Sequence, residues 1–249
     1  MIVYFLYKLV VIPERTKKML SLTQEFVKEI ERRILTGQWE IGGKIPPVRE
    51  LAEEFHVSRS VLNAGIAELC SNGYLTTVPR KYICVSDWRR MGNFALLSGL
   101  IDNGLYDENF YDDLFEGRMT IGKAIAGKAA MARTDEDLAE IEKIIERERH
   151  CVTPMDSAEA DKEFHHAIAS ASHNIVYSVI LNSFNTVSDK LMLEFYEREI
   201  DRDFVLGMHE KICEAIKSGD IAGAEEKMAI LLDHGEREMK NKGGHYGEV

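Results

Sequence analysis

The chain has 249 residues, 45% of them hydrophobic, which is enough to bury an ordinary core in one or two domains. Its four cysteines lie far apart without a CxxC pair, which excludes a disulfide framework and indicates reduced thiols in a cytoplasmic protein. The net charge of -11 is unevenly divided, since residues 1–90 hold 14 Lys and Arg against 10 Asp and Glu. The remaining residues hold 17 against 32. A modestly basic first part therefore precedes a strongly acidic second part, and the basic part can bind phosphate.

The first twelve residues, MIVYFLYKLVVI, are apolar but too short to span a bilayer and are interrupted by Lys8. They have neither a basic start nor a small-residue cleavage site, so we predict no signal peptide and no membrane anchor. Two interpretations of residues 1–20 stay open. They form an N-terminal extension that packs on the fold, or translation begins near Met19.

The first predicted element is an amphipathic helix from Ser21 to Leu35, which Gly37 can end. The stretch from Pro46 to Leu69 then predicts two short helices joined by a tight turn. Apolar residues recur at helical spacing in both of them: Val48, Leu51, Ala52, Phe55, Leu62, Ile66 and Leu69. Ser58 is a suitable N-cap for the second helix. Polar residues lie opposite the apolar side near the start of that helix, where a recognition helix contacts base edges: Arg59, Ser60 and Asn63.

Two short β-prone runs follow, from Tyr74 to Val78 and from Tyr82 to Val85. Pro79, Arg80 and Lys81 form the turn between them. Three helices and a hairpin predict a winged helix over residues 21–86, in which Arg80 and Lys81 reach toward a phosphate or the minor groove.

After a linker at 87–94, the sequence has almost no strand signal, which predicts an all-helical bundle at 95–240 and a tail at 241–249. Caps and apolar runs place its helices at about Phe94–Asn103, Glu108–Met131, from Thr134 on, Ser157–Ser172, Asn174–Glu197, Phe204–Lys217, and from Asp220 to about Lys240. The predicted fold class is mostly α, with an N-terminal winged helix-turn-helix followed by a helical bundle.

The runs "IPPVRELAEEF", "VSRS" and "GYL" resemble the winged-helix domain of GntR-type bacterial transcription regulators. The resemblance implies a homodimer whose recognition helices enter successive major grooves of a near-palindromic operator. It assigns DNA-facing places to Arg49, Ser58, Arg59, Ser60, Arg80 and Lys81. Many relatives have arginine in place of Asn63, and Asn pairs best with adenine whereas Arg pairs with guanine. Arg80 and Tyr82 replace the wing glycines of the family, so the wing tip here is bulkier.

Asp161 and His165 are four residues apart on a predicted helix, so both can bind one metal ion. Such a pair is also common on helix surfaces, and a histidine beside Phe164 can simply be a bundle residue. The runs "DKEFHHAIASASHN" and "MHEKICEAIKSGDIAGAEEKM" resemble the C-terminal FCD-type ligand domain of the FadR branch, which often holds a divalent metal through one Asp and three His.

On this resemblance His209 takes a third ligand place, but the fourth falls on Leu231, and His234 lies about one turn further along. Three outcomes stay open. A shifted helix lets His234 complete the site, three protein ligands leave positions for water and effector, or the metal has been lost. Zn²⁺, Ni²⁺ and Mn²⁺ all suit such a ligand set.

Arg118 matches an arginine that precedes the ligand cavity in this branch, so the resemblance makes it a partner for a small anionic effector. The alternative is a helix-surface ion pair with Glu116. The whole pattern predicts a ligand-responsive transcription regulator, a repressor by family analogy, that is released or modulated by a small organic acid. Two alternatives are a regulator for which bound metal is itself the signal, and a metal-dependent hydrolase. We predict no enzyme, because no nucleophile motif or oriented general base accompanies the candidate ligands.

Overall fold

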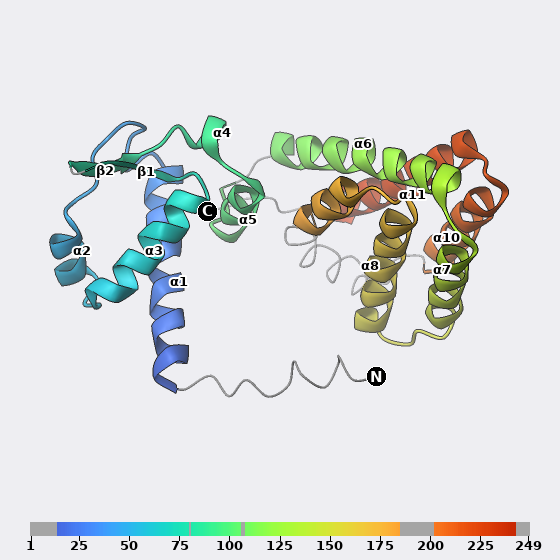
Figure 1. Cartoon of the computed structure of the whole chain (residues 1–249), viewed down its shortest axis with the longest axis horizontal. Helices are drawn as coiled ribbons and strands as arrows, with labels where there is room; N and C mark the ends of the chain where they lie inside the picture. The colour runs from blue at the N-terminus through green and yellow to red at the C-terminus, as the bar shows by residue number, and fades with distance from the viewer. Residues whose placement is uncertain (1–13, 80, 106–107, 185–201, 243–249) are drawn as a thin grey trace. The chain divides into compact units, whose positions relative to one another are not determined.

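The computed structural model describes residues 14–79, 81–105, 108–184 and 202–242, shown as ribbons in Figure 1. The chain divides into two compact units, Met1–Leu105 and Tyr106–Val249. The first contains a helix-turn-helix and a two-stranded antiparallel sheet, and the second is helical throughout its described residues, so the predicted fold class is confirmed. No helix among the described residues is long and apolar enough to cross a membrane.

The first unit is built on a long helix, α1, against which α3 packs. Its first five elements are α1 (Glu14–Leu35), α2 (Val48–Glu54), α3 (Arg59–Ser71), β1 (Leu75–Val78) and β2 (Tyr82–Val85). Helix α1 begins seven residues before the predicted start at Ser21, because neither glycine nor proline interrupts the sequence from Glu14 to Leu35. The hydrophobic stripe marks the part of α1 that needs burial, and not the end of the helix.

The helix-turn-helix forms as predicted. His56 adopts a left-handed conformation in the turn (φ 52°), and the Ser58 hydroxyl accepts a hydrogen bond from the Val61 amide at 3.3 Å. Gly73, at φ 82°, allows the chain to leave α3. At Gly65 the two helices α1 and α3 come so close that a Cβ atom would lie 2.5 Å from the Phe26 ring. The position of α3 is therefore fixed by close packing on α1.

Strands β1 and β2 pair in the predicted hairpin, with Thr76 opposite Cys84. Lys44, on the chain leading into α2, also pairs with Cys84 of β2. This bridge connects the base of the wing to the start of the helix-turn-helix. Arg80 at the turn lies outside the described residues.

Two further helices follow the wing within the first unit, α4 (Trp88–Met91) and α5 (Phe94–Asp102). Helix α5 packs on α1, and its Gly99 lies against Tyr74, where a Cβ atom would be 2.1 Å from the Tyr74 hydroxyl oxygen. The division between units thus falls after Leu105, beyond the linker predicted at 87–94. The assignment of residues 95–105 to the effector-binding domain stays a prediction.

The second unit contains α6 (Glu108–Ala132), α7 (Asp135–Glu148), α8 (Pro154–Ala171), a helical segment at 175–184, α10 (Arg202–Ser218) and α11 (Ile221–Lys242). Capping boxes at Thr134 and Thr153 start α7 and α8. The second box, with Pro154 in the first turn, starts α8 three residues before the predicted Ser157. Residues 185–197 of the predicted helix 174–197 lie outside the described residues.

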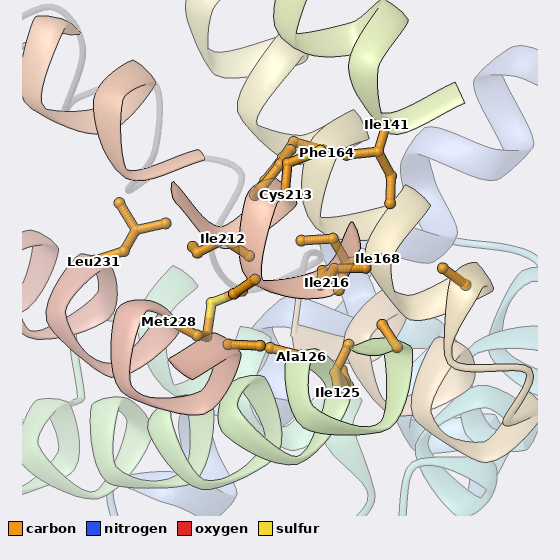
Figure 2. Close-up of a cluster of buried hydrophobic side chains, with 14 of the residues drawn as sticks. Ile125, Ala126, Ile141, Phe164, Ile168, Ile212, Cys213, Ile216, Met228 and Leu231 are labelled. Atoms are coloured by element: carbon orange, nitrogen blue, oxygen red, sulfur yellow. The ribbon is translucent and has the colours of Figure 1, made fainter. Parts of the chain in front are cut away.

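These helices surround one hydrophobic core, part of which is shown in Figure 2. Its labelled members come from five helices: Ile125, Ala126, Ile141, Phe164, Ile168, Ile212, Cys213, Ile216, Met228 and Leu231. Helices α6 and α11 approach closely at Gly122, where a Cβ atom would lie 2.6 Å from Leu232. The core thus brings side chains from α8 and α10 together inside the bundle.

Candidate functional site

The candidate DNA-binding residues of the helix-turn-helix are all exposed. Arg59, Ser60 and Asn63 lie on the solvent side of the first two turns of α3, opposite the buried Leu62. Arg49, at the start of α2, has a 78% exposed side chain and pairs with Glu53 at 3.2 Å. An exposed pair of this kind stabilises a helix by well under 1 kcal/mol, about 0.3–0.5, so Arg49 can exchange Glu53 for a phosphate at little cost.

Lys81 is also exposed and lies in the turn directly before β2. Beside it, the Lys44 ammonium lies 4.4 Å from the centre of the Tyr82 ring, which is a cation–π contact. Tyr82 thus holds a second lysine on the wing, at a position where the family has glycine. Lys44 was not among the basic residues predicted from the sequence, because only the cross-strand register brings it to Tyr82.

In the second unit, the structure brings together three of the predicted metal ligands. Asp161, His165 and His209 each offer a ligand atom, and these atoms all lie within 4.8 Å of one another. Asp161 Oδ2 is 3.9 Å from His165 Nε2, and Asp161 Oδ1 is 3.4 Å from His209 Nε2. All three residues are buried, Asp161 and His165 on α8 and His209 on α10.

The donor set fits a divalent cation by its chemistry and by one unsatisfied atom. His209 Nε2 is buried and has no hydrogen-bond partner among the described residues. Its other ring nitrogen, Nδ1, lies 2.8 Å from Glu148 Oε2 and so has a partner. A histidine held through one nitrogen, with the other directed at a carboxylate and a second histidine, is the arrangement found in metal sites. Without a metal, the same cluster is a buried ionic network.

The charges of the cluster are strongly coupled. Burial opposes the charged form of His209, but the Asp161 and Glu148 carboxylates outweigh it and raise its pKa to about 9. Burial, with help from the Arg118 guanidinium, lowers the pKa of His165 to about 3 despite Asp161 nearby. Burial also opposes ionisation of Asp161, yet His165, His209 and Arg118 lower its pKa below the usual value.

Arg118 on α6 is half-buried, and its charge acts on both Asp161 and His165. Burial lowers the pKa of Arg118, whereas Asp161 raises it. A cation this close to a metal-ligand set, on another helix, is suited to hold the carboxylate of a bound anion.

His234, the predicted fourth ligand, does not share the cluster. Among the described residues, the ligand atoms that meet belong to the other three residues, and the His234 ring lies 4.1 Å from the Phe204 ring. Leu231, which falls on the expected ligand place, is buried in the hydrophobic core. The described residues thus bring three of the four predicted ligands together.

Two further residues complete the surroundings of His209. Glu148 ends α7, and Phe164 stacks on the His209 ring with centroids 3.8 Å apart. Phe164 was a visible core candidate, but Glu148 lies in a run of charged residues and has no local signal. Its separation of 61 residues from His209 means that only the packing of α7 against α10 brings them together.

An exposed recognition helix with a wing, joined to a helical bundle that encloses titratable groups, defines a DNA-binding transcription regulator with its own sensor domain. Comparison with protein families agrees. Residues 22–85 match the family "Bacterial regulatory proteins, gntR family", and residues 113–234 match the FCD domain. The chain belongs to the GntR family of bacterial transcription regulators, and its FCD domain fits the FadR-type branch.

Relatives with similar sequences are regulators too. The chain is 28% identical over 200 residues to the "Uncharacterized HTH-type transcriptional regulator YcbG" of Bacillus subtilis, covering 80% of this chain and 82% of the relative. It is 28% identical over 238 residues to the "Putative L-lactate dehydrogenase operon regulatory protein" of Escherichia coli, covering 93% and 89%. The solved structure of Lar, from Listeria monocytogenes, shares the fold, with a TM-score of 0.59 at 17% identity, covering 88% and 96%.

Proposed function

We propose that this regulator is a repressor that binds a near-palindromic operator as a homodimer and that a small organic acid releases or modulates it. The observation that carries the proposal is the buried cluster of Asp161, His165 and His209 beside Arg118, which combines metal ligands with a cation. The name of the Escherichia coli relative refers to an L-lactate dehydrogenase operon, which supports a small organic acid as the effector.

On the DNA side, Arg49 and the first turn of α3 make the main contacts. Arg59 and Ser60 approach the major groove, and Asn63 pairs with adenine where many relatives use arginine for guanine. Ser58 serves the fold as a cap and contributes to the same surface. Lys81, with Arg80, contacts phosphate or the minor groove.

In the bundle, Asp161, His165 and His209 would hold a divalent metal such as Zn²⁺, Ni²⁺ or Mn²⁺. When bound, the metal would supply a Lewis acid for the carboxylate of the effector. Arg118 pairs with the same carboxylate and orients it. His234 completes the site only if α11 shifts, so the three-ligand form, which leaves positions for water and effector, is the one proposed.

The effector acts by preferring one of two arrangements of the helices around the site. It can shift the operator-binding equilibrium only by the difference between its affinities for the two arrangements. If zinc alone changes operator affinity to the same extent without any acid, then the metal itself is the signal.

The DNA part is tested with a labelled fragment of the protein's own promoter region, by fluorescence anisotropy over a series of salt concentrations. Arg59→Ala is expected to weaken operator binding by about 1–3 kcal/mol, roughly 5- to 150-fold. Arg32→Ala is the matched control, because Arg32 lies in the same unit but already pairs with Glu29 at 2.8 Å. Equal weakening in both variants contradicts the assignment of Arg59.

The metal part is tested by elemental analysis of purified protein and by zinc titration. Asp161→Ala and His209→Ala are expected to lose the metal, whereas His150→Ala, which removes a histidine with a 77% exposed side chain, keeps it. Negligible metal in the wild-type protein, or equal metal in all four proteins, contradicts the metal site.

A further inference from the structure

Glu148 and His209 form a buried pair from two different helices of the bundle. The Glu148 carboxylate, on the last turn of α7, lies 2.8 Å from His209 Nδ1 on α10. The Glu148 side chain is 7% exposed, and that of His209 is fully buried. Two groups this enclosed have lost their water, so the hydrogen bond between them is a strong constraint on both.

Three contacts fix the orientation of the His209 ring. Phe164 stacks on its face at 3.8 Å with an angle of 24° between the rings, and Glu148 binds Nδ1. Asp161 Oδ1 lies 3.4 Å from the other ring nitrogen, Nε2. The ring can therefore neither turn over nor tilt without losing a contact, and Nε2 stays directed at Asp161 and His165.

Two carboxylates lie next to the ring. Within the described ranges, no lysine or arginine nitrogen lies within 4.0 Å of the Glu148 carboxylate, since the adjacent Arg147 and Arg149 pair with Glu163 and Glu210. Two buried carboxylates, Glu148 and Asp161, thus share His209. Buried carboxylates need a compensating cation. Arg118 acts on Asp161, and a divalent ion on the Nε2 side would add to this positive charge.

We infer that Glu148 is a positioning residue for the metal site, acting through His209. By accepting the hydrogen bond of Nδ1–H, Glu148 leaves Nε2 as the nitrogen that binds the metal, with release of its proton, and its negative charge makes the imidazole a stronger ligand. This carboxylate offsets the loss of the fourth ligand at Leu231, because it strengthens one of the three that are left. The inference rests on the proposed metal site and adds a residue that does not touch the metal.

A structural role for Glu148 predicts a different result from a positioning role. If Glu148 served only to hold α7 against α10, its replacement would lower the stability of the metal-free protein and change zinc affinity only in parallel. If Glu148 prepares His209 for the metal, an isosteric neutral replacement lowers zinc affinity by more than any change in the stability of the metal-free protein accounts for. Glu148→Gln separates the two, because the amide oxygen can still accept from Nδ1–H but carries no charge.

The experiment uses the full-length protein with Zn²⁺ alone, titrated in competition with a chromophoric chelator. Glu148→Gln is expected to raise the zinc Kd about 10- to 100-fold, the usual effect of removing such a partner. Glu146→Gln is the matched control, because Glu146 lies on the same helix with a 59% exposed side chain, and its Kd should stay within about twofold. Urea unfolding of each metal-free protein is measured alongside.

A second readout is the visible absorption of the Co²⁺-loaded protein, which depends on the ligand field. Glu148→Gln is expected to shift the cobalt bands, and Glu146→Gln to leave them unchanged. Zinc binding that is lost in Asp161→Ala but unchanged in Glu148→Gln overturns the inference about Glu148 alone. A wild-type protein that binds no zinc overturns the metal site and the inference together.

Discussion

Replacing Glu31 by glutamine tests how the first unit tolerates a buried carboxyl group at the junction of α1, α3 and α5. Glu31 is only 8% exposed, and Gly99 of α5 lies so close that a Cβ atom there would be 3.5 Å from the Glu31 carboxyl carbon. Burial, followed by the charges of Glu68 and Asp102, raises its pKa to about 7, and Lys28 opposes this rise. The surroundings of Glu31 thus keep its carboxyl group mostly protonated and uncharged until the pH approaches 7.

The sign of the effect follows from linkage between protonation and folding. The folded pKa of about 7 exceeds the ordinary value of 4.5, so Glu31 favours folding fully below about pH 4.5. That contribution is lost as the pH rises through 7, and stays lost above it. At 1.36 kcal/mol per pKa unit, the rise from 4.5 to about 7 corresponds to about 3.4 kcal/mol, which partial solvent screening reduces to about 1–2 kcal/mol.

Tryptophan fluorescence during urea unfolding measures this contribution selectively, because both tryptophans, Trp39 and Trp88, belong to the first unit. Between pH 5 and pH 8 the free energy of unfolding of the wild-type unit is expected to fall by about 1–2 kcal/mol more than that of Glu31→Gln. At pH 8, Glu31→Gln should be the more stable of the two proteins. Glu40→Gln, at an exposed position, is the control and should follow the wild type. Identical pH dependence in wild type and Glu31→Gln would refute the reasoning.

Three further predictions concern packing, capping and the metal. Gly99→Ala should destabilise the first unit by about 1–3 kcal/mol through the clash with Tyr74. Gly207→Ala, whose added Cβ meets no described residue within 4 Å, should stabilise its helix by up to about 1 kcal/mol. Denaturation followed by circular dichroism measures both changes. Thr153→Ala should cost about 1 kcal/mol in the same assay, because it removes the cap of α8. Zinc at a hundred times its Kd should stabilise the wild-type protein by about 2.7 kcal/mol and Asp161→Ala not at all, as seen in thermal unfolding with and without a chelator.

The sequence alone predicted most of the fold, because its signals are local. Helical periodicity, the Ser58 cap and Gly73 define the helix-turn-helix within a few residues of where it lies. Boundaries were less well predicted where two signals competed, as at Thr153, whose capping box starts α8 ahead of Ser157. The side on which α5 packs has no local signal, since it depends on the fit of Gly99 over Tyr74.

Part of the candidate site could likewise be predicted from the sequence, and part of it could not. The spacing of Asp161 and His165 on one helix placed two metal ligands together from sequence alone, and the resemblance to the FadR branch added His209. Tertiary structure decided that His234 stays apart and that Glu148 binds His209 across 61 residues. Contacts within one helix follow from its period, whereas a contact between helices depends on how whole faces pack, which the sequence of neither helix determines by itself.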